Sequence, residues 1–305
     1  MDFETILEEY IIFHRSQCHT EKTVKNYEEV LNMFHKVVQL NDYGTITYQD
    51  VVKYQKYLSR KMLSPATVAS YLRHIKAFVR WLDEYDYLQE KGWYSKIKLP
   101  KTPKKNVKIY TDSELTRIFD STVSRTPLLT ARNKLIISLM LDSGLRRNEV
   151  CLIKYSDIDF ENCMLNVHGK GRKDRLVPIG SLTMQCLEEY RSLCQFESEF
   201  LLVDKSGSPL SNNAVKLFMA KMQKKLGFEF SSHKLRHNFA TNYIIDHYDK
   251  YGYFDSYTLM VLLGHEEIST TERYVHYGKQ VIASRERCSH LDRVFLDSQK
   301  SVSKM

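Results

Sequence analysis

The chain has 305 residues, a length at which a single hydrophobic core usually stops growing, so two domains of unequal size are expected. Its formal net charge of +8, with 27% charged and 43% hydrophobic residues, describes a soluble protein with surplus positive surface and favours a polyanionic partner, although lipid-surface binders share that charge. The six cysteines lack a CxxC pair and no apolar run approaches the roughly 20 residues that span a bilayer, which argues against a zinc site, a redox motif and a membrane protein.

A helical domain is predicted over residues 1–95. The first residues are acidic where a signal peptide needs basic ones, so a cytoplasmic location is expected. Apolar residues recur at helical spacing in a helix that begins near Phe3, in a second that Thr20 caps, and in a third over 48–60. A fourth helix begins at Ser64-Pro65, a capping residue followed by proline at the first helical position. Its buried face is expected to hold Val68, Leu72, Ile75, Val79 and Leu82.

The fourth helix also carries a basic stripe. Arg73, Lys76 and Arg80 recur at positions i, i+3 and i+7 and are predicted to lie along a DNA backbone, although a solvated helix face has the same pattern. Residues 96–110 then bring prolines and many lysines without apolar periodicity, which is typical of an extended interdomain linker. A basic linker suits two domains that close around a duplex as a clamp.

A second domain is predicted over residues 111–290, followed by a tail over 291–305. Apolar residues on either side of Gly169-Lys170-Gly171 alternate along 164–179, which indicates a strand, a glycine turn and a strand. A basic helix over 212–226 includes Lys216, a further candidate DNA contact, and helices are expected to continue to about residue 290. The expected fold class is therefore mainly α, with a small antiparallel β-sheet in an α+β C-terminal domain.

Four short segments in the second half contain the residues suited to chemistry. They are Ser143 to Val150 (SGLRRNEV), Gly169-Lys170-Gly171, His233 to His237 (HKLRH), and Leu263-Gly264-His265 followed by Tyr274. Together they closely resemble the tyrosine recombinase (phage integrase-like) family, whose pattern has an arginine, a turn lysine, a His-x-x-Arg, a Leu-Gly-His and a tyrosine in this order. Tyr274 follows His265 by 9 positions, as the family's spacing implies. The first hundred residues also resemble the family's helical core-binding domain, including the phrase SPATVASYLRHIKAFVRWL.

The resemblance implies a catalytic set with defined roles. Its members are Arg146, Lys170, His233, Arg236, His265 and Tyr274. The planar arginine forks suit phosphate oxygens that gain charge in the transition state. Tyr274 would attack phosphorus to give a 3′-phosphotyrosine and a free 5′-hydroxyl, and Lys170 would protonate the leaving oxygen. A phenol needs a base or a strong field to ionise, and whether His233 or His265 provides it stays open.

Several neighbours of these residues compete with them or support them. Lys173 is an alternative to Lys170, and Tyr277 is an alternative to Tyr274 as nucleophile. Glu149, three residues after Arg146, is interpreted either as a brace for that arginine or as a surface carboxylate. The histidine next to Arg236 points about 100° away from it around a helix. The histidines interpreted as structural are His168, His237 and His276.

The implied function is site-specific recombination of double-stranded DNA by a homotetramer through a Holliday junction, in integration, excision or resolution. No Walker motif or clear acidic cluster is present, so no metal and no other cofactor is expected. The chain begins directly with the expected bundle, which favours a simple Xer-like or transposon-encoded enzyme. The tail over 291–305 is expected either to dock on a neighbouring subunit or to fold on its own domain. A type IB topoisomerase and a non-catalytic DNA-binding accessory protein are the alternatives, and DNA-bending helper proteins are a further expected partner.

Overall fold

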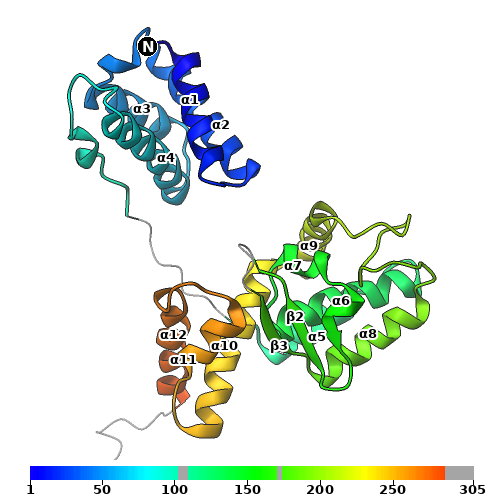
Figure 1. Ribbon diagram of the computed structural model, residues 1–305. Helices are drawn as coiled ribbons and strands as arrows, with labels where there is room; N and C mark the ends of the chain where they lie inside the picture. Colours follow the sequence, from blue (N-terminus) through cyan, green and yellow to red (C-terminus); the bar gives the residue numbers. More distant parts are fainter. Residues whose placement is uncertain (102–108, 170–173, 286–305) are drawn as a thin grey trace, which may run out of the picture. The chain divides into compact units, whose positions relative to one another are not determined.

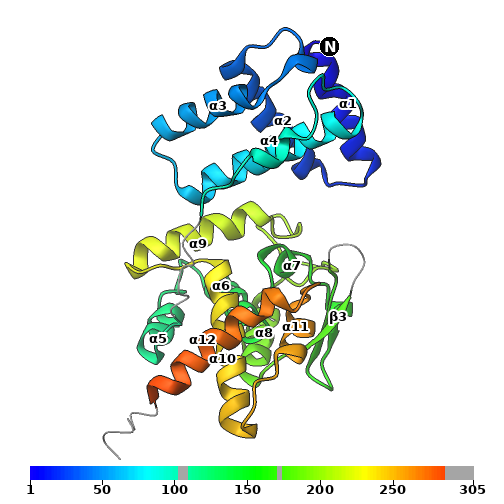
Figure 2. The same ribbon diagram turned by 90° about the vertical axis from the view of Figure 1, so that its left-hand side faces the viewer.

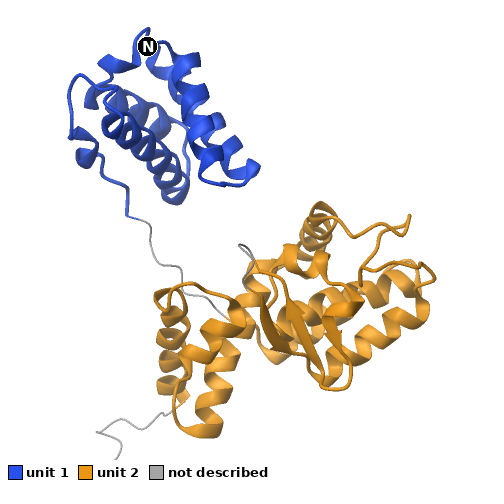
Figure 3. Cartoon of the chain, in the orientation of Figure 1, with its two compact units in different colours: residues 1–105 blue, residues 106–305 orange. Residues whose placement is uncertain are grey.

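The computed structural model describes residues 1–101, 109–169 and 174–285 and divides the chain into two compact units, residues 1–105 and 106–305 (Figure 3). Lys170, Lys173 and the predicted tail over 291–305 lie outside the described residues. Within the described ranges, no helix is long and apolar enough to cross a membrane. Each unit is described by itself below.

The N-terminal unit is a helical bundle (Figure 1). Its α-helices are α1 (Phe3–Ser16), α2 (Glu21–Val38), α3 (Tyr48–Arg60) and α4 (Pro65–Glu84), with 3₁₀ turns η1 (Tyr43–Thr45) and η2 (Trp93–Lys96). The predicted caps are confirmed, because the hydroxyls of Thr20 and Ser64 accept backbone N–H bonds from Thr23 and Thr67 at 3.3 and 3.2 Å.

The core of this unit differs in detail from the predicted apolar stripe. Leu72, Ile75, Val79 and Leu82 are buried as predicted, but Val68 is only half-buried. Ala69 and Phe78 are buried as well, and Val68 packs against the edge of the core cluster that includes Phe78. The core therefore surrounds a wider arc of this helix than a single stripe suggests.

The C-terminal unit is mainly helical and contains one small sheet in its described part. Its elements are α5 (Asp112–Asp120), α6 (Pro127–Asp142), α7 (Arg147–Leu152), η3 (Tyr155–Asp157), β1 (Ile158–Asp159), β2 (Met164–Val167), β3 (Arg175–Pro178), α8 (Ser181–Leu193), α9 (Asn212–Leu226), α10 (Ser232–Tyr251), α11 (Ser256–Leu263) and α12 (Ser269–Arg285). The strands are antiparallel in the order β1-β2-β3, and Leu165 pairs with Val177 in the predicted hairpin. The predicted fold class, the hairpin and the helix over 212–226 are confirmed.

Two packed groups of helices make up this unit. α6 packs against α8, and its buried residues from Leu135 to Met140 form the centre of the larger core. α10, α11 and α12 contact one another; they lie beside that body in Figure 1 and in front of it in Figure 2. A smaller core, which includes Ile244, Leu263 and Tyr274, holds this second group together.

The two ends of the predicted linker pack into the units. Ile97 is buried in the core of the N-terminal unit, and Tyr110 is buried in the core of the C-terminal unit. The backbone N–H of Tyr110 also donates to the Asn238 side chain at 2.8 Å. Ile97 and Tyr110, near the two ends of the predicted range 96–110, are therefore core residues.

Candidate active site

Arg146 enters the site from a glycine turn between α6 and α7. Gly144 has a φ of +61°, and a Cβ there would lie 2.3 Å from the ring of Phe239, so only glycine fits this turn. The Arg146 guanidinium donates to Glu149 Oε1 at 2.8 Å and to the carbonyl of Gly264 at 3.1 Å. Its side chain is 44% exposed, so its remaining N–H groups stay open to a ligand.

Glu149 is a buried brace for two arginines. Its Oε2 accepts the backbone N–H of Arg146 at 2.7 Å, and its two oxygens accept both terminal nitrogens of Arg175, on β3, at 3.0 and 2.8 Å. Burial raises the pKa of Glu149, but the hydrogen bonds and the charge of Arg175, and then the bonds from Arg146, hold it below the usual value. The brace interpretation of Glu149 therefore agrees with the geometry, since a surface carboxylate would be exposed.

Arg236, on α10, is the second guanidinium of the site. It donates to the carbonyls of Gly144 and Leu263 at 2.7 and 2.6 Å, and it is 5% exposed. Burial, followed by the charge of Arg146, lowers the pKa of Arg236 to about 10, which keeps it charged at neutral pH. Because Arg146 and Arg236 bond to the consecutive carbonyls of residues 263 and 264, their guanidiniums converge on one turn.

His265 follows that turn directly. Its Nδ1 lies 2.8 Å from the Thr271 hydroxyl, and its ring faces the ring of Tyr274 with centroids 6.5 Å apart. Burial, followed by the charges of Arg236 and Arg146, lowers the pKa of His265 to about 4. The imidazole is therefore neutral at physiological pH.

Tyr274 is buried, with 2% exposure, near the N-terminal end of α12. Its hydroxyl lies 2.6 Å from His237 Nδ1 and accepts a hydrogen bond from Arg273 Nη2 at 2.8 Å. The Arg273 guanidinium also lies over the ring, 4.8 Å from its centroid. The hydroxyl thus contacts both a neutral nitrogen and a cation.

His237 connects Tyr274 to His233. The Nε2 atoms of His237 and His233 are 2.6 Å apart, so His233 contacts the tyrosine only through its neighbour in this arrangement. Burial, followed by the proximity of His233 and Arg273, lowers the pKa of His237 to about 3. Burial, followed by the charges of Arg273 and Arg236, also lowers the pKa of His233.

Three residues of this arrangement were not identified as site residues from the sequence. Arg175 occupies an inward position of a strand beside Val177, and an inward arginine signals a buried partner. The interpretation of His237 as structural considered only its neighbour Arg236; its spacing of four from His233 places both histidines on one helix face. Nothing in the sequence pattern distinguishes Arg273.

The remaining predicted DNA contacts are on α4, in the N-terminal unit, and on α9, in the C-terminal unit. Arg73 and Lys216 are exposed on α4 and α9, as DNA contacts require. Lys76 donates to the carbonyl of Ile97 at 3.2 Å, and Arg80 forms an exposed ion pair with Glu84 at 2.7 Å. Part of the predicted basic stripe is therefore already engaged within its own unit.

Within residues 1–101, 109–169 and 174–285, no group of three or more histidine, cysteine, aspartate or glutamate side chains is placed to hold a metal ion.

Comparisons with known proteins place this geometry in context. Residues 108–280 match the model of the phage integrase family, and residues 7–84 match that of the phage integrase N-terminal SAM-like domain. The Tyrosine recombinase XerC of Oceanobacillus iheyensis is 28% identical over 297 residues, covering 94% of this chain and 95% of that protein. The XerC of Halalkalibacterium halodurans is 29% identical, covering 89% and 92%.

Solved structures share the fold at lower identity. A XerH site-specific recombinase bound to palindromic difH substrate, in a post-cleavage complex, has a TM-score of 0.70 and 22% identity, covering 92% of this chain and 82% of that one. A lambda integrase dimer bound to a core site has a TM-score of 0.72 and 18% identity, covering 90% and 95%.

Proposed function

This chain belongs to the phage integrase family, and from that premise we propose that it is a site-specific recombinase that cuts and rejoins DNA through Tyr274. The observation that carries the proposal is the convergence of Arg146 and Arg236 on the carbonyls of Leu263 and Gly264, next to His265 and Tyr274. This arrangement supports phosphate binding beside a nucleophile.

The arginines would bind the non-bridging oxygens of the phosphodiester that is cut. Their fixed forks stabilise the charge that grows on these oxygens as the phosphorus becomes five-coordinate. Tyr274 Oη forms a bond to phosphorus while the bond from phosphorus to the 5′-oxygen breaks, and Lys170 gives that oxygen a proton. A 5′-hydroxyl of another strand then attacks the phosphotyrosine in the reverse sense. Because one ester replaces another at each step, the reaction consumes no nucleotide.

The substrate would be double-stranded DNA held by both units as a clamp. Arg73 and Lys216 offer exposed charge for phosphate contacts, which fix register without reading sequence. We propose a homotetramer that brings two sites together and passes through a Holliday junction in the cytoplasm, with DNA-bending partners at some sites. Integration, excision and resolution, on a mobile element or a chromosome, all use this chemistry.

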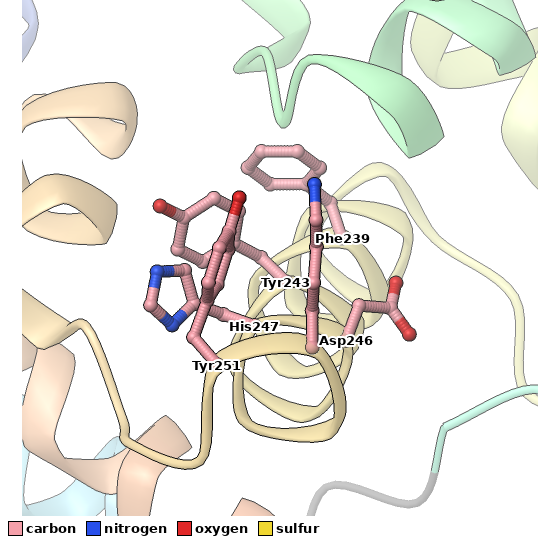
Figure 4. Close-up of a pocket in the computed structure, with 6 residues that line it drawn as sticks. Phe239, Tyr243, Asp246, His247 and Tyr251 are labelled. Carbon is pink, nitrogen blue, oxygen red and sulfur yellow. The ribbon is translucent and has the colours of Figure 1, made fainter.

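A hollow on α10 supports contacts between subunits. It is lined by Phe239, Tyr243, Asp246, His247, Lys250 and Tyr251 (Figure 4). Tyr251 and the nearby Tyr253 and Tyr257 are 56%, 58% and 69% exposed. Their rings leave apolar surface in contact with water, which is typical of an interaction surface. We propose that the sequence over 291–305, with its apolar Val294 and Phe295, covers this surface on a neighbouring subunit.

The test is covalent trapping on DNA. The wild type and a Tyr274→Phe variant are incubated with a library of nicked duplexes, and protein–DNA adducts that survive denaturant are isolated and their DNA is sequenced. We expect an adduct at one recurring sequence with the wild type and none with the variant, and a Tyr277→Phe control that still forms it. Binding without any adduct would favour an accessory protein. Relaxation of a supercoiled plasmid that lacks the selected site would favour a type IB topoisomerase.

A further inference from the structure

His237 lies where the proton of the nucleophile has to go. It is 6% exposed, and its Nδ1 is 2.6 Å from the Tyr274 hydroxyl. Its other nitrogen is 2.6 Å from His233 Nε2, and His233 is only partly enclosed, so that part of the residue is exposed to solvent. A hydrogen-bonded chain therefore runs from the buried hydroxyl of Tyr274 to the surface of the unit.

The direction of each hydrogen bond follows from its partners. Arg273 has only donors, so it donates to the tyrosine oxygen, and the phenol proton is free to point at His237 Nδ1. A neutral His237 that accepts at Nδ1 must carry its proton on Nε2 and donate it to His233. His233 then accepts at Nε2 and carries its own proton on Nδ1. Both short contacts are satisfied in this way with two neutral imidazoles.

We propose that His237 takes the proton of Tyr274 at Nδ1 as it passes its Nε2 proton to His233, an inference that rests on the proposed function. Arg273 stabilises the phenolate oxygen during this transfer. The O–H bond of Tyr274 breaks, its electron pair forms the new bond to phosphorus, and His233 releases a proton from Nδ1 to water. His237 ends the step as the other neutral tautomer. When the phosphotyrosine is broken, His237 Nδ1 returns its proton to the tyrosine oxygen while Nε2 takes one from His233, which restores the starting tautomer.

The charges around His237 explain why a relay suits this site better than a single base. Arg236 and His233 lie on its own helix, Arg273 and Tyr274 face it from α12, and His265 faces it from the preceding turn. These groups, together with burial, strongly disfavour an imidazolium at this position. A relay avoids the imidazolium because His237 gains a proton at Nδ1 while it loses one from Nε2.

The experiment measures the single-turnover rate of adduct formation on the DNA sequence that the wild type selects. The scissile phosphate carries a bridging sulfur in place of its 5′-oxygen, so that the leaving thiolate needs no proton and the rate reports activation of Tyr274. The variants are His237→Ala and His237→Asn, because asparagine offers an acceptor near Nδ1 but no second ring nitrogen. His276→Ala, at an exposed position of α12, is the matched control.

We expect both His237 variants to be slowed about 100-fold or more, the usual contribution of a positioned proton acceptor. Their rates should rise about tenfold per pH unit, because the concentration of free phenolate in water rises in this way below the pKa of the phenol. The rate of the wild type should change little with pH. Incorporation of 3-fluorotyrosine at position 274, which ionises more readily, should restore much of the rate of the variants and little affect the wild type. Circular dichroism and DNA binding identify any variant that fails to fold, and the other variant then carries the test.

Two results would overturn the relay. Rates of the His237 variants within about threefold of the wild type would show that the proton leaves by another route. A slow rate with the pH profile of the wild type and no effect of 3-fluorotyrosine would assign His237 a packing role only. A wild type that forms no adduct, even on the sulfur substrate, would instead overturn the function on which the relay rests.

Discussion

Glu149→Gln should destabilise the C-terminal unit, although it changes the side chain by only one atom. The two carboxylate oxygens receive four hydrogen bonds, two from Arg146 and two from Arg175. Glutamine replaces one oxygen with an NH₂ group, which turns an acceptor of two N–H groups into a donor that opposes them. The Glu149 and Arg175 side chains are 7% and 5% exposed, so water cannot take the place of the lost acceptor.

The expected magnitude follows from the two lost bonds. A hydrogen bond to a charged group contributes about 1.5 kcal/mol or more, so two of them amount to about 3 kcal/mol. Removing one partner of a buried ion pair costs roughly 3–5 kcal/mol by itself, which agrees. The sign of the pH dependence follows from the lowered pKa of Glu149: its contribution is present above the ordinary value of 4.5 and is lost as the pH falls through the folded value.

The chain provides its own internal control for this measurement. Both tryptophans, Trp81 and Trp93, belong to the N-terminal unit, so their fluorescence reports the unfolding of that unit alone. Circular dichroism in urea reports both units. We expect Glu149→Gln to move the circular dichroism transition of the C-terminal unit to lower urea and to leave the fluorescence transition in place.

An Arg175→Met background tests the reasoning further. Without the buried guanidinium, the same glutamine substitution should cost less than half as much, because the one charge that still pairs with residue 149 is that of Arg146, which is 44% exposed and can be solvated by water. A loss below about 0.5 kcal/mol in the wild-type background, or an equal loss in both backgrounds, would refute the brace as the cause.

Three further predictions follow from other contacts. Gly144→Ala should cost about 1–3 kcal/mol for its positive φ alone and more for the clash with Phe239, so it should lower the melting temperature further than Gly227→Ala, where φ is +74° but no atom lies within 4 Å of the added Cβ. Hydrogen bonds that His168 donates to Asp157 and then to Asp174 raise its pKa, so its contribution to stability is complete below the ordinary value of 6.5 and is lost as the pH rises through the folded value. His168→Gln should therefore flatten the fall in melting temperature above pH 6.5, and an unchanged profile would contradict this. Arg73→Ala and Lys216→Ala should each lower the slope of log affinity for DNA against log salt by about one, whereas Lys76→Ala, which removes a donor to Ile97, should lower it less; equal slopes in gel-shift titrations would count against these contacts.

Local sequence patterns predicted the elements of the fold well. Helix caps such as Thr20 and Ser64 act on backbone groups three residues away, and the hairpin around 164–179 depends on alternation and a glycine turn, so both can be read from neighbouring residues. The breadth of the buried surface on α4 could not be predicted from neighbouring residues, because it depends on which helices pack around Phe78. The same holds for Ile97 and Tyr110, which look like linker residues until a core is present to bury them.

The sequence could point to candidate site residues where the residue type suggests the chemistry, and could not where a role depends on contacts in the fold. Arg146, Arg236 and Tyr274 carry groups that few other residues replace, so their motifs identify them. Arg175 and Arg273 act on neighbours 26 positions and one position away in the sequence, and no spacing rule connects such pairs. The spacing of His233 and His237 was informative, since residues four apart share a helix face.

The groups that bond to the two guanidiniums explain why the sequence does not predict these contacts and why the pKa values of the nearby histidines are low. Arg236 bonds to the carbonyls of Gly144 and Leu263, which every residue type can offer, so no sequence motif marks these acceptors. Carbonyls orient a guanidinium without neutralising it. After burial, the charge of Arg236 lowers the pKa of His265, and it adds to the effects of burial, His233 and Arg273 on the pKa of His237. A DNA phosphate bound by the arginines would offset that charge and raise both pKa values again. In the proposed mechanism, DNA binding would thereby favour proton transfer, because the histidines would accept a proton more easily once the phosphate is bound.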